Sequence, residues 1–336
     1  MRRYRGRRWF LVLLLLTLGV ILLPDPFTRP AAGAPVKRIV IAPGSSFGVV
    51  TDSLVARGIV TNRTWFKALA RARGLDRSVQ AGAYEFRPGE SSWRVLNTLK
   101  SGRTAAIRFT VPEGLSLIEL SILARDRLGI PPESVLAAAR DPVEIAALEL
   151  QGKSLEGFLF PETYNIPVNS SARDLVRIMT RGFLEAWRPE WDRRLTELGM
   201  TREQAMTLAS IVEGEARADD ERETIAGTYH NRLKIGMALQ ADPTVQYAIE
   251  QKTGRPKQRL FEKDYQTPSP YNTYLNPGLP PGPVNSPGFR SIEATLQPAN
   301  VPYLYFVAGE GGRHVFSRTY DEHLRAVAQS RRARGR

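Results

Sequence analysis

The chain has 336 residues, with 47 lysines and arginines, 34 aspartates and glutamates and no cysteine, which gives a net charge of +13. Its length predicts about two domains, and the lack of cysteine excludes disulfides, thiolate metal sites, a lipid-modified cysteine and a cysteine nucleophile. Nine of the thirteen net positive charges come from arginines within residues 1–8 and 331–336, so only about four remain elsewhere, too few to indicate a nucleic-acid partner.

The first predicted element is an apolar run of 15 residues, Trp9–Leu23, that follows an arginine-rich start. Fifteen residues are fewer than the roughly 20 that span a bilayer upright, and they are also typical of a signal peptide. However, the small-residue cleavage site Ala32-Gly-Ala34 is followed directly by Pro35. We therefore predict a retained transmembrane helix over residues 9–23, after a cytoplasmic tail of residues 1–8 and before a linker of residues 24–35. Since arginines stay on the cytoplasmic side, most of the chain is predicted to lie outside the inner (plasma) membrane.

A strand, a turn, a serine and a helix follow one another three times after the linker. The predicted strands are Arg38–Ala42, Ala83–Arg87 and Ile107–Val111, the turns are Pro43-Gly44, Pro88-Gly89 and Pro112-Glu113-Gly114, and the helices end at Arg57, Lys100 and Arg127. Each turn breaks its strand, and a serine after it can cap the next helix: Ser45 in the first copy, Ser91-Ser92 in the second and Ser116 in the third. With a further helix over Thr61–Arg73, residues 36–102 are predicted to run strand, helix, helix, strand, helix.

One of these turns also matches a catalytic motif. Gly44-Ser-Ser-Phe-Gly48 has the G-x-S-x-G pattern of a nucleophile elbow, which would make Ser46 the nucleophile of a hydrolase. Only one predicted strand precedes it, so there is no sheet to carry such an elbow. Because the same turn and cap recur at two other places, we favour the structural interpretation.

The chain becomes mostly helical after Thr110. The predicted helices are Ser116–Leu128, Pro132–Arg140, Ala172–Trp187, Thr201–Ala216 and Asp219–Leu233, and short strands return at Tyr303–Ala308 and His314–Phe316. Between them, Pro268–Gly288 is rich in Pro, Gly, Asn and Tyr, and a loop of that length inside a domain is usually functional. The fold class is therefore predicted to be α+β, mostly helical with short strands.

The helix over Thr201–Ala216 carries the carboxylate of most interest. Thr201 and Gln204 form a capping box at its start, and one apolar stripe follows, made of Ala205, Leu208, Ala209, Val212 and Ala216. Glu213 lies on the flank of this stripe and Glu215 on the opposite flank. A glutamate at the edge of an apolar face can be partly desolvated, which raises its pKa and suits it to donate a proton. The alternative is a solvated glutamate at the edge of the helix.

Several segments outside this helix complete a family pattern. They are Leu155–Tyr164, Thr228–Met237, Leu239–Tyr247, Ser269–Tyr274, Gly278–Gly282 and Val301–Ala308. Together with Leu208–Ala216, in this order and spacing, they make the chain resemble the YceG-like lytic transglycosylases, the endolytic murein transglycosylases of bacterial cell walls. The resemblance implies that Glu213 is the catalytic acid/base. It also implies a LysM-like subdomain over residues 36–108, which binds glycan or serves as a spacer, a catalytic domain over residues 109–325 and a basic tail over residues 326–336.

The resemblance further implies the reaction and the partners. In this family one acid protonates the glycosidic oxygen between N-acetylmuramic acid (MurNAc) and N-acetylglucosamine (GlcNAc). The 6-hydroxyl of MurNAc then attacks its own C1, which leaves a 1,6-anhydro end and needs no second carboxylate. The expected partners are peptidoglycan glycan strands, the membrane and peptidoglycan synthases. A non-catalytic scaffold that binds peptidoglycan from its membrane anchor is the alternative.

Six residues in the family-like segments are candidates for contact with the glycan. They are Asn231, Gln240, Asp242, Tyr271, Asn272 and Tyr274. Amides and tyrosines suit sugars because they hydrogen-bond hydroxyl and acetamido groups and stack on pyranose rings. Alternatively, the Asn231 and Asp242 side chains cap or turn the backbone, and the tyrosines pack. For Glu156 and Glu162, a structural hydrogen bond is the favoured role.

The three histidines, His230, His314 and His323, show no spacing typical of metal ligands. The sequence therefore predicts neither a metal nor a cofactor.

Overall fold

The computed structural model describes residues 35–334, apart from residues 43 and 103–104. The predicted cytoplasmic tail, transmembrane helix and most of the linker lie outside these residues. Within the described part, no helix is long and apolar enough to cross a membrane. The chain divides into two compact units, one with the described residues up to Ile107 and Asn165–Asn169, the other with Arg108–Tyr164 and Ser170–Arg336.

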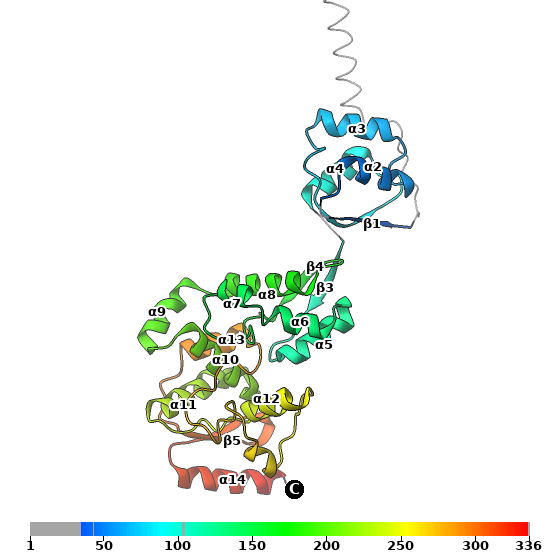
Figure 1. Cartoon of the computed structure of the whole chain (residues 1–336). Coiled ribbons are helices and arrows are strands. Elements are labelled where there is room, and N and C mark those ends of the chain that lie inside the picture. Colours follow the sequence, from blue (N-terminus) through cyan, green and yellow to red (C-terminus); the bar gives the residue numbers. More distant parts are fainter. Residues whose placement is uncertain (1–34, 43, 103–104, 335–336) are drawn as a thin grey trace, which may run out of the picture. The chain divides into compact units, whose positions relative to one another are not determined.

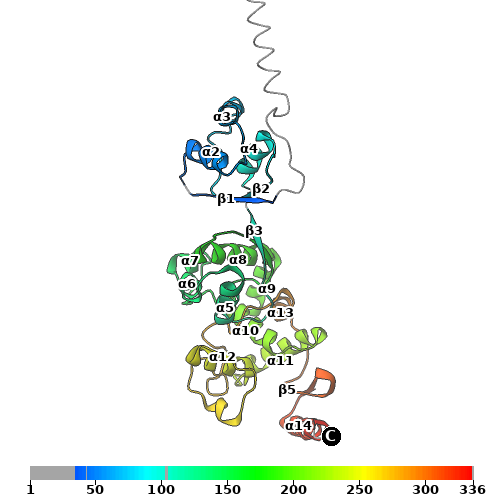
Figure 2. The same cartoon turned by 90° about the vertical axis from the view of Figure 1, so that its right-hand side faces the viewer.

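The first unit is a two-stranded sheet with helices on one side (Figures 1 and 2). Its elements are β1 (Lys37–Ile41), α2 (Phe47–Ala56), α3 (Arg63–Ala72), β2 (Gly82–Phe86) and α4 (Ser92–Ser101), in the predicted order. The strands β1 and β2 pair antiparallel, with Ile39 opposite Tyr84. Ile39 and Ile41 are buried while Val40 between them is 54 % exposed, so one face of β1 supplies the core.

The helices of this unit begin at polar caps. Ser46, Asn62 and Ser91 each accept a hydrogen bond from the backbone three residues on, and this satisfies a free N–H group of the first turn. The Ser46 hydroxyl lies 3.4 Å from Val49 N. The structure therefore assigns Gly44–Gly48 to a turn and a cap, as favoured from the sequence, with Ser46 rather than Ser45 at the cap position.

The second unit is mostly helical (Figure 1). Its helices are α5 (Leu117–Leu128), α6 (Pro132–Ala138), α7 (Pro142–Ala146), α8 (Ala172–Ala186), α9 (Pro189–Leu198), α10 (Arg202–Glu215), α11 (Arg222–Lys234), α12 (Asp242–Thr253), α13 (Phe289–Leu296) and α14 (Tyr320–Arg334), with 3₁₀ turns η1 (Asp219–Glu221), η2 (Glu262–Gln266) and η3 (Glu310–Gly312). Two short antiparallel strands, β5 (Tyr305–Ala308) and β6 (His314–Ser317), pack against α14. Another two-stranded sheet joins β3 (Ala106–Thr110) and β4 (Thr163–Pro167). The described chain is thus mixed α+β, mostly helical with short strands.

Several elements were not predicted from the sequence: β4, α7, α9, α12, α13 and α14. A turn at Asp242-Pro243 was the alternative to glycan contact for Asp242, but the dipeptide opens α12, because a proline without an N–H group fits the first turn of a helix. Pro142 opens α7 and Pro189 opens α9 in the same way. The helix α14 continues through residues 326–334, which the sequence assigned to a basic tail.

The helix α10 lies at the centre of the second unit. It contacts α9, α11, α12 and α13, and every residue from Ala205 to Val212 is buried. The prediction of a single buried stripe was therefore too narrow, because partners surround the middle of the helix. Its two ends reach the protein surface, the N-terminal turn up to Gln204 and the C-terminal turn from Glu213 onward.

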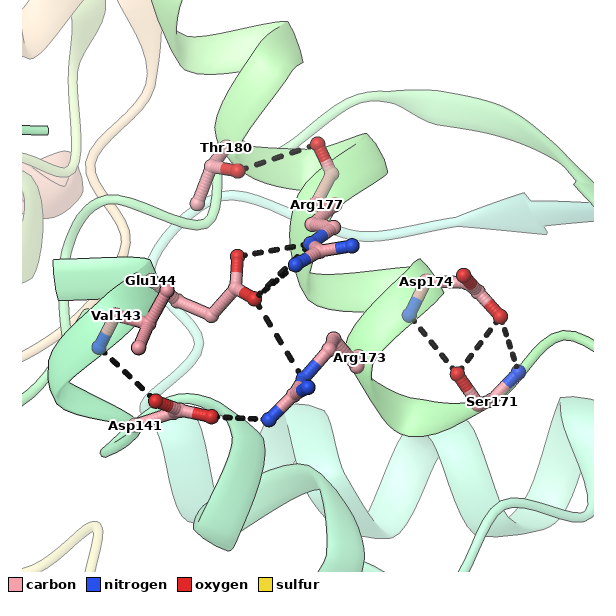
Figure 3. A network of polar contacts seen from close by, with 8 residues as sticks. All are labelled: Asp141, Val143, Glu144, Ser171, Arg173, Asp174, Arg177 and Thr180. Carbon is pink, nitrogen blue, oxygen red and sulfur yellow. Dashed lines mark hydrogen bonds and ion pairs between the residues drawn. The ribbon is translucent and has the colours of Figure 1, made fainter. Parts of the chain in front are cut away.

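The helices α7 and α8 are joined by charged side chains (Figure 3). Glu144 on α7 is buried, and its carboxylate lies 2.7 Å from Arg177 Nη2 and 3.5 Å from Arg173 Nε on α8. Arg173 also pairs with Asp141, which caps α7 through Val143 N at 2.9 Å. The network satisfies a buried carboxylate with two guanidinium groups, and it fixes α7 against the neighbouring helix.

Candidate active site

Glu213 lies in the last turn of α10, where the helix emerges from the core. The predicted capping box is present at the other end, with Gln204 N 3.1 Å from Thr201 Oγ1 and Thr201 N 2.8 Å from Gln204 Oε1. The Glu213 side chain is only 8 % exposed. One carboxylate oxygen pairs with Arg222 Nη2 at 3.3 Å, and the other accepts a hydrogen bond from Gly288 N at 3.0 Å. Together the two contacts fix the orientation of the carboxylate.

Arg222, the first residue of α11, is itself held from several sides. It is buried, and its Nε donates to Ser291 Oγ at 2.9 Å. The same guanidinium pairs with Asp219 in η1, and Asp219 also pairs with Arg290 in α13. Because Ser291 and Asp219 hold the guanidinium on two sides, it presents a fixed positive charge to Glu213.

The long loop predicted to be functional contains no helix or strand and is anchored to α10. Val284 N lies 3.0 Å from Ser210 Oγ, and Asn285 Nδ2 lies 2.8 Å from the Ser210 carbonyl oxygen. These bonds carry the end of the loop past the C-terminal turn of α10. As a result, Gly288 N is placed against Glu213.

A second carboxyl group, Glu113, lies at the same place. Its turn is joined to the long loop by two backbone hydrogen bonds of 2.8 Å, from Gly114 N to the Ser286 carbonyl and from Ser286 N to the Leu115 carbonyl. Partial burial raises the pKa of Glu113, and the negative charge of Glu213 raises it further. The sequence interpretation missed this residue, since Pro112-Glu113-Gly114 was taken only as a turn. The presence of a carboxylate in that turn, unlike in the other two, was the one available signal.

The six predicted glycan contacts lie in several different settings. Asp242 and Tyr274 meet each other, with the Tyr274 hydroxyl 2.7 Å from the Asp242 carboxylate. They border Glu215 rather than Glu213, because the backbone N–H of Asp242 donates to the Glu215 carboxylate. Tyr229 also donates to Glu215, at 3.1 Å. Burial, followed by the charge of Asp242, raises the pKa of Glu215 to about 7.

The two asparagines of the predicted set bind backbone. Asn231 donates to the carbonyls of Val301 and Tyr303, at 2.7 and 3.1 Å. Asn272 is fully buried, and it donates to the carbonyls of Tyr265 and Thr267, both at 2.9 Å. In this structure both side-chain amides therefore hold the backbone of other segments.

The remaining two residues differ in exposure. Gln240 is exposed and has a φ of 49°, and its backbone N–H donates to the Thr273 carbonyl at 3.2 Å. The partly buried Tyr271 packs its ring against Tyr247, with centroids 4.8 Å apart. Of the six residues, Gln240 is the most open to solvent.

Glu156 and Glu162 make the structural hydrogen bonds that were favoured for them. Glu156 is buried and accepts from Leu117 N at 2.9 Å and from the Tyr247 hydroxyl at 3.1 Å. Burial raises the pKa of Glu156 to about 8. The exposed Glu162 accepts from the backbone of Thr163 at 2.8 Å.

Two surface hollows flank Leu279 near the N-terminal half of α10. One is lined by residues such as Gln151, Arg202 and Thr207, and the other by residues such as Met200 and His230. Neither hollow is lined by Glu213. The position of surface hollows therefore does not by itself indicate where Glu113 and Glu213 lie. Among the described residues, no group of three or more metal-ligating side chains is arranged to hold an ion.

Comparisons with known proteins show the family of the chain. The model of the YceG-like family matches residues 39–329, and the chain belongs to that family. An endolytic murein transglycosylase of Bacillus subtilis (strain 168) is 33 % identical over 309 residues, which cover 86 % of this chain and 83 % of that protein. A protein of the same name from Streptococcus pneumoniae (serotype 2, strain D39) is 28 % identical over 319 residues, and the match spans 57 % of its length.

A solved structure is also similar. The crystal structure of a YceG-like protein from Listeria monocytogenes aligns with a TM-score of 0.59 and 30 % sequence identity. The alignment covers 87 % of this chain and 99 % of the Listeria chain. The similarity in fold therefore extends over most of the chain.

Proposed function

We propose that this protein is an endolytic lytic transglycosylase of peptidoglycan. It cleaves the bond between MurNAc and GlcNAc within glycan strands and leaves 1,6-anhydro-MurNAc ends. The observation that carries the proposal is the setting of Glu213, a nearly buried carboxylate with two fixed partners at the end of α10. Two relatives that match 86 % of the chain are named endolytic murein transglycosylases.

The chemistry requires a group that moves a proton, and Glu213 is the group we assign to it. In the single-carboxylate reaction, the glycosidic oxygen takes a proton from Glu213 as its bond to C1 breaks. The 6-hydroxyl oxygen of MurNAc then bonds to C1 as it gives its proton back to Glu213. An internal nucleophile is already positioned, so no water is consumed. The Gly288 N–H and the Arg222 guanidinium hold the Glu213 carboxylate in place to receive the hydroxyl proton.

The test is digestion of purified sacculi, with the product ends identified by mass spectrometry. Glu213→Gln keeps the size of the side chain but cannot move the proton, so the rate of anhydro-end formation should fall by about 10² to 10⁴. Glu215→Gln is the matched control. The raised pKa of Glu215, about 7, means that glutamine resembles its protonated form, so most activity should remain. Equal behaviour of the two variants would refute the role of Glu213.

The alternative is a non-catalytic, membrane-anchored scaffold that binds peptidoglycan. The same digestion separates the two functions, because a scaffold would be retained on sacculi without releasing anhydro ends. The paired carboxyl groups at Gly288 favour the enzyme, since binding alone does not require them.

The location and the N-terminal region complete the proposal. We infer a single membrane anchor over residues 9–23, with the N-terminus in the cytoplasm, a position that would bring the enzyme near peptidoglycan synthases. Cell fractionation should recover full-length protein in membranes, cleavable by protease from the outer face. A soluble product that begins near Pro35 would contradict the anchor.

We also infer that residues 36–108 form a LysM-like subdomain. In this region β1 and β2 pair antiparallel, and α2 and α3 lie between the two strands in sequence. This arrangement supports the inference. Fold alone does not establish glycan binding, so retention of Val36–Gly102 on sacculi should be weak or absent. Tight, saturable retention would contradict that expectation.

A further inference from the structure

Two carboxyl groups contact the same glycine, Gly288, beside the C-terminal end of α10. Gly288 N donates to Glu213, and the carboxyl group of Glu113 occupies the space that a Cβ at Gly288 would need. On the other side, a Cβ at Gly114 would lie 3.7 Å from Glu213 Cγ. The turn that carries Glu113 is therefore packed directly against the Glu213 side chain. The single-carboxylate reaction does not use this second group.

The two carboxyl groups differ in exposure. Glu113 is exposed, whereas the Glu213 side chain is only 8 % exposed. A glycan strand that approaches the end of α10 can therefore reach Glu113 directly. This accessibility is what a group needs if it is to meet the glycosidic oxygen.

The two carboxyl groups have different neighbours. Arg222 and the Gly288 N–H both contact the Glu213 carboxylate. Partial burial raises the pKa of Glu113, as do the negative charges of Glu213 and then Asp219, while the positive charges of Arg222 and Arg290 lower it. Two neighbouring carboxyl groups with unequal surroundings divide the roles of acid and base.

We propose that Glu113 is a second catalytic residue, which donates a proton to the glycosidic oxygen while Glu213 accepts the proton of the 6-hydroxyl. The proposal rests on the proposed transglycosylase function. As the bond from C1 to the leaving oxygen breaks, that oxygen takes the proton of Glu113, and the 6-oxygen bonds to C1 and gives its proton to Glu213. The proton then returns from Glu213 to Glu113. No water, oxidant or other reactant is needed, and both groups regain their starting states.

A structural role is the competing explanation, because the turn of Glu113 also joins the long loop. That joining depends on backbone bonds of Gly114, Leu115 and Ser286, which a side-chain substitution at residue 113 leaves intact. Glu113→Gln should therefore fold normally, with an unchanged melting temperature. Gly288→Ala is a second variant, because the new methyl group displaces the Glu113 carboxyl without removing any titratable group.

The experiment compares two substrates with the purified full-length protein. On natural glycan strands, Glu113→Gln should form anhydro ends about 10² to 10⁴ times more slowly, and Gly288→Ala should also be slowed. On a synthetic peptidoglycan oligomer with a 4-nitrophenyl leaving group on MurNAc, which needs no protonation, Glu113→Gln should return to within about tenfold of the wild-type rate. Glu213→Gln should stay slow on both substrates, because the 6-hydroxyl still needs a base. Glu133→Gln, an exposed substitution on α6, is the matched control.

The pH dependence gives an independent measurement. The wild-type rate on natural strands should fall as pH rises through the pKa of Glu113, because the donor loses its proton, and the residual rate of Glu113→Gln should lack this fall. A wild-type rate for Glu113→Gln on natural strands would overturn the proposal, as would equal losses on both substrates. A wild-type protein that forms no anhydro ends would instead refute the proposed function itself.

Discussion

Replacing Glu156 by glutamine should change how the stability of the protein depends on pH. Glu156 is 4 % exposed, and Leu117 N and the Tyr247 hydroxyl donate to its carboxyl group. These two donors favour the charged form, but burial outweighs them, and the negative charge of Glu250 adds to the effect. The carboxyl group is therefore protonated in the folded protein at pH values where it is ionised in the unfolded chain.

The size of the effect follows from the shift in pKa. Burial raises the pKa of Glu156 from 4.5 to about 8. At 1.36 kcal/mol for each unit, the protonated group contributes up to about 5 kcal/mol to the free energy of unfolding. This contribution is complete below pH 4.5 and is lost as pH rises through 8, because the folded state binds the proton more tightly than the unfolded state. Since whole domains are stable by about 5–15 kcal/mol, the loss should be easy to measure.

The assay is urea unfolding of wild-type and Glu156→Gln protein at pH 5 and pH 9. Glutamine is neutral at both values, so the variant should lack this part of the pH dependence. At pH 5 the variant should be less stable than wild type by about 1 kcal/mol, because the hydrogen bond between residue 156 and the Tyr247 hydroxyl has a different donor in the variant. At pH 9 the order should reverse. Glu162→Gln, at an exposed glutamate nearby, is the control, and parallel pH profiles for wild type and Glu156→Gln would refute the reasoning.

Three further substitutions test the packing around the site. Asn272→Ala should destabilise the protein by about 2–4 kcal/mol in urea unfolding, because the Tyr265 and Thr267 carbonyls lose the buried side-chain amide that donates to them. Gly227→Ala should lower the melting temperature, since a Cβ there would overlap the Ala299 carbonyl oxygen, and an unchanged value would contradict this packing. Arg222→Gln should cost about 3–5 kcal/mol, because it leaves Glu213 nearly buried without its cation, and should also slow anhydro-end formation on sacculi. Full activity with unchanged stability would show that the ion pair has no role.

Local sequence determined the helix starts and the position of the main carboxylate. The caps at Ser91, Ser116 and Thr201 were predicted because each uses a hydroxyl and an N–H group within three residues. The helix start at Asp242-Pro243 was not predicted, because the same dipeptide is also typical of a turn. The family-like segments singled out Glu213, but they did not separate residues that face the glycan from those that hold backbone, such as Asn272.

Only the tertiary structure brought Glu113 to Glu213. The two residues are far apart in sequence, and they meet because the loop before Gly288 binds both α10 and the turn at Gly114. The same long-range packing surrounded α10 with helices and placed Glu215 beside Asp242. Sequence periodicity describes contacts within a few residues, so it fixes where helices begin and which residues share a face. The burial and charge of a carboxyl group depend on segments that arrive from elsewhere in the chain, and those are set by close packing of the whole fold.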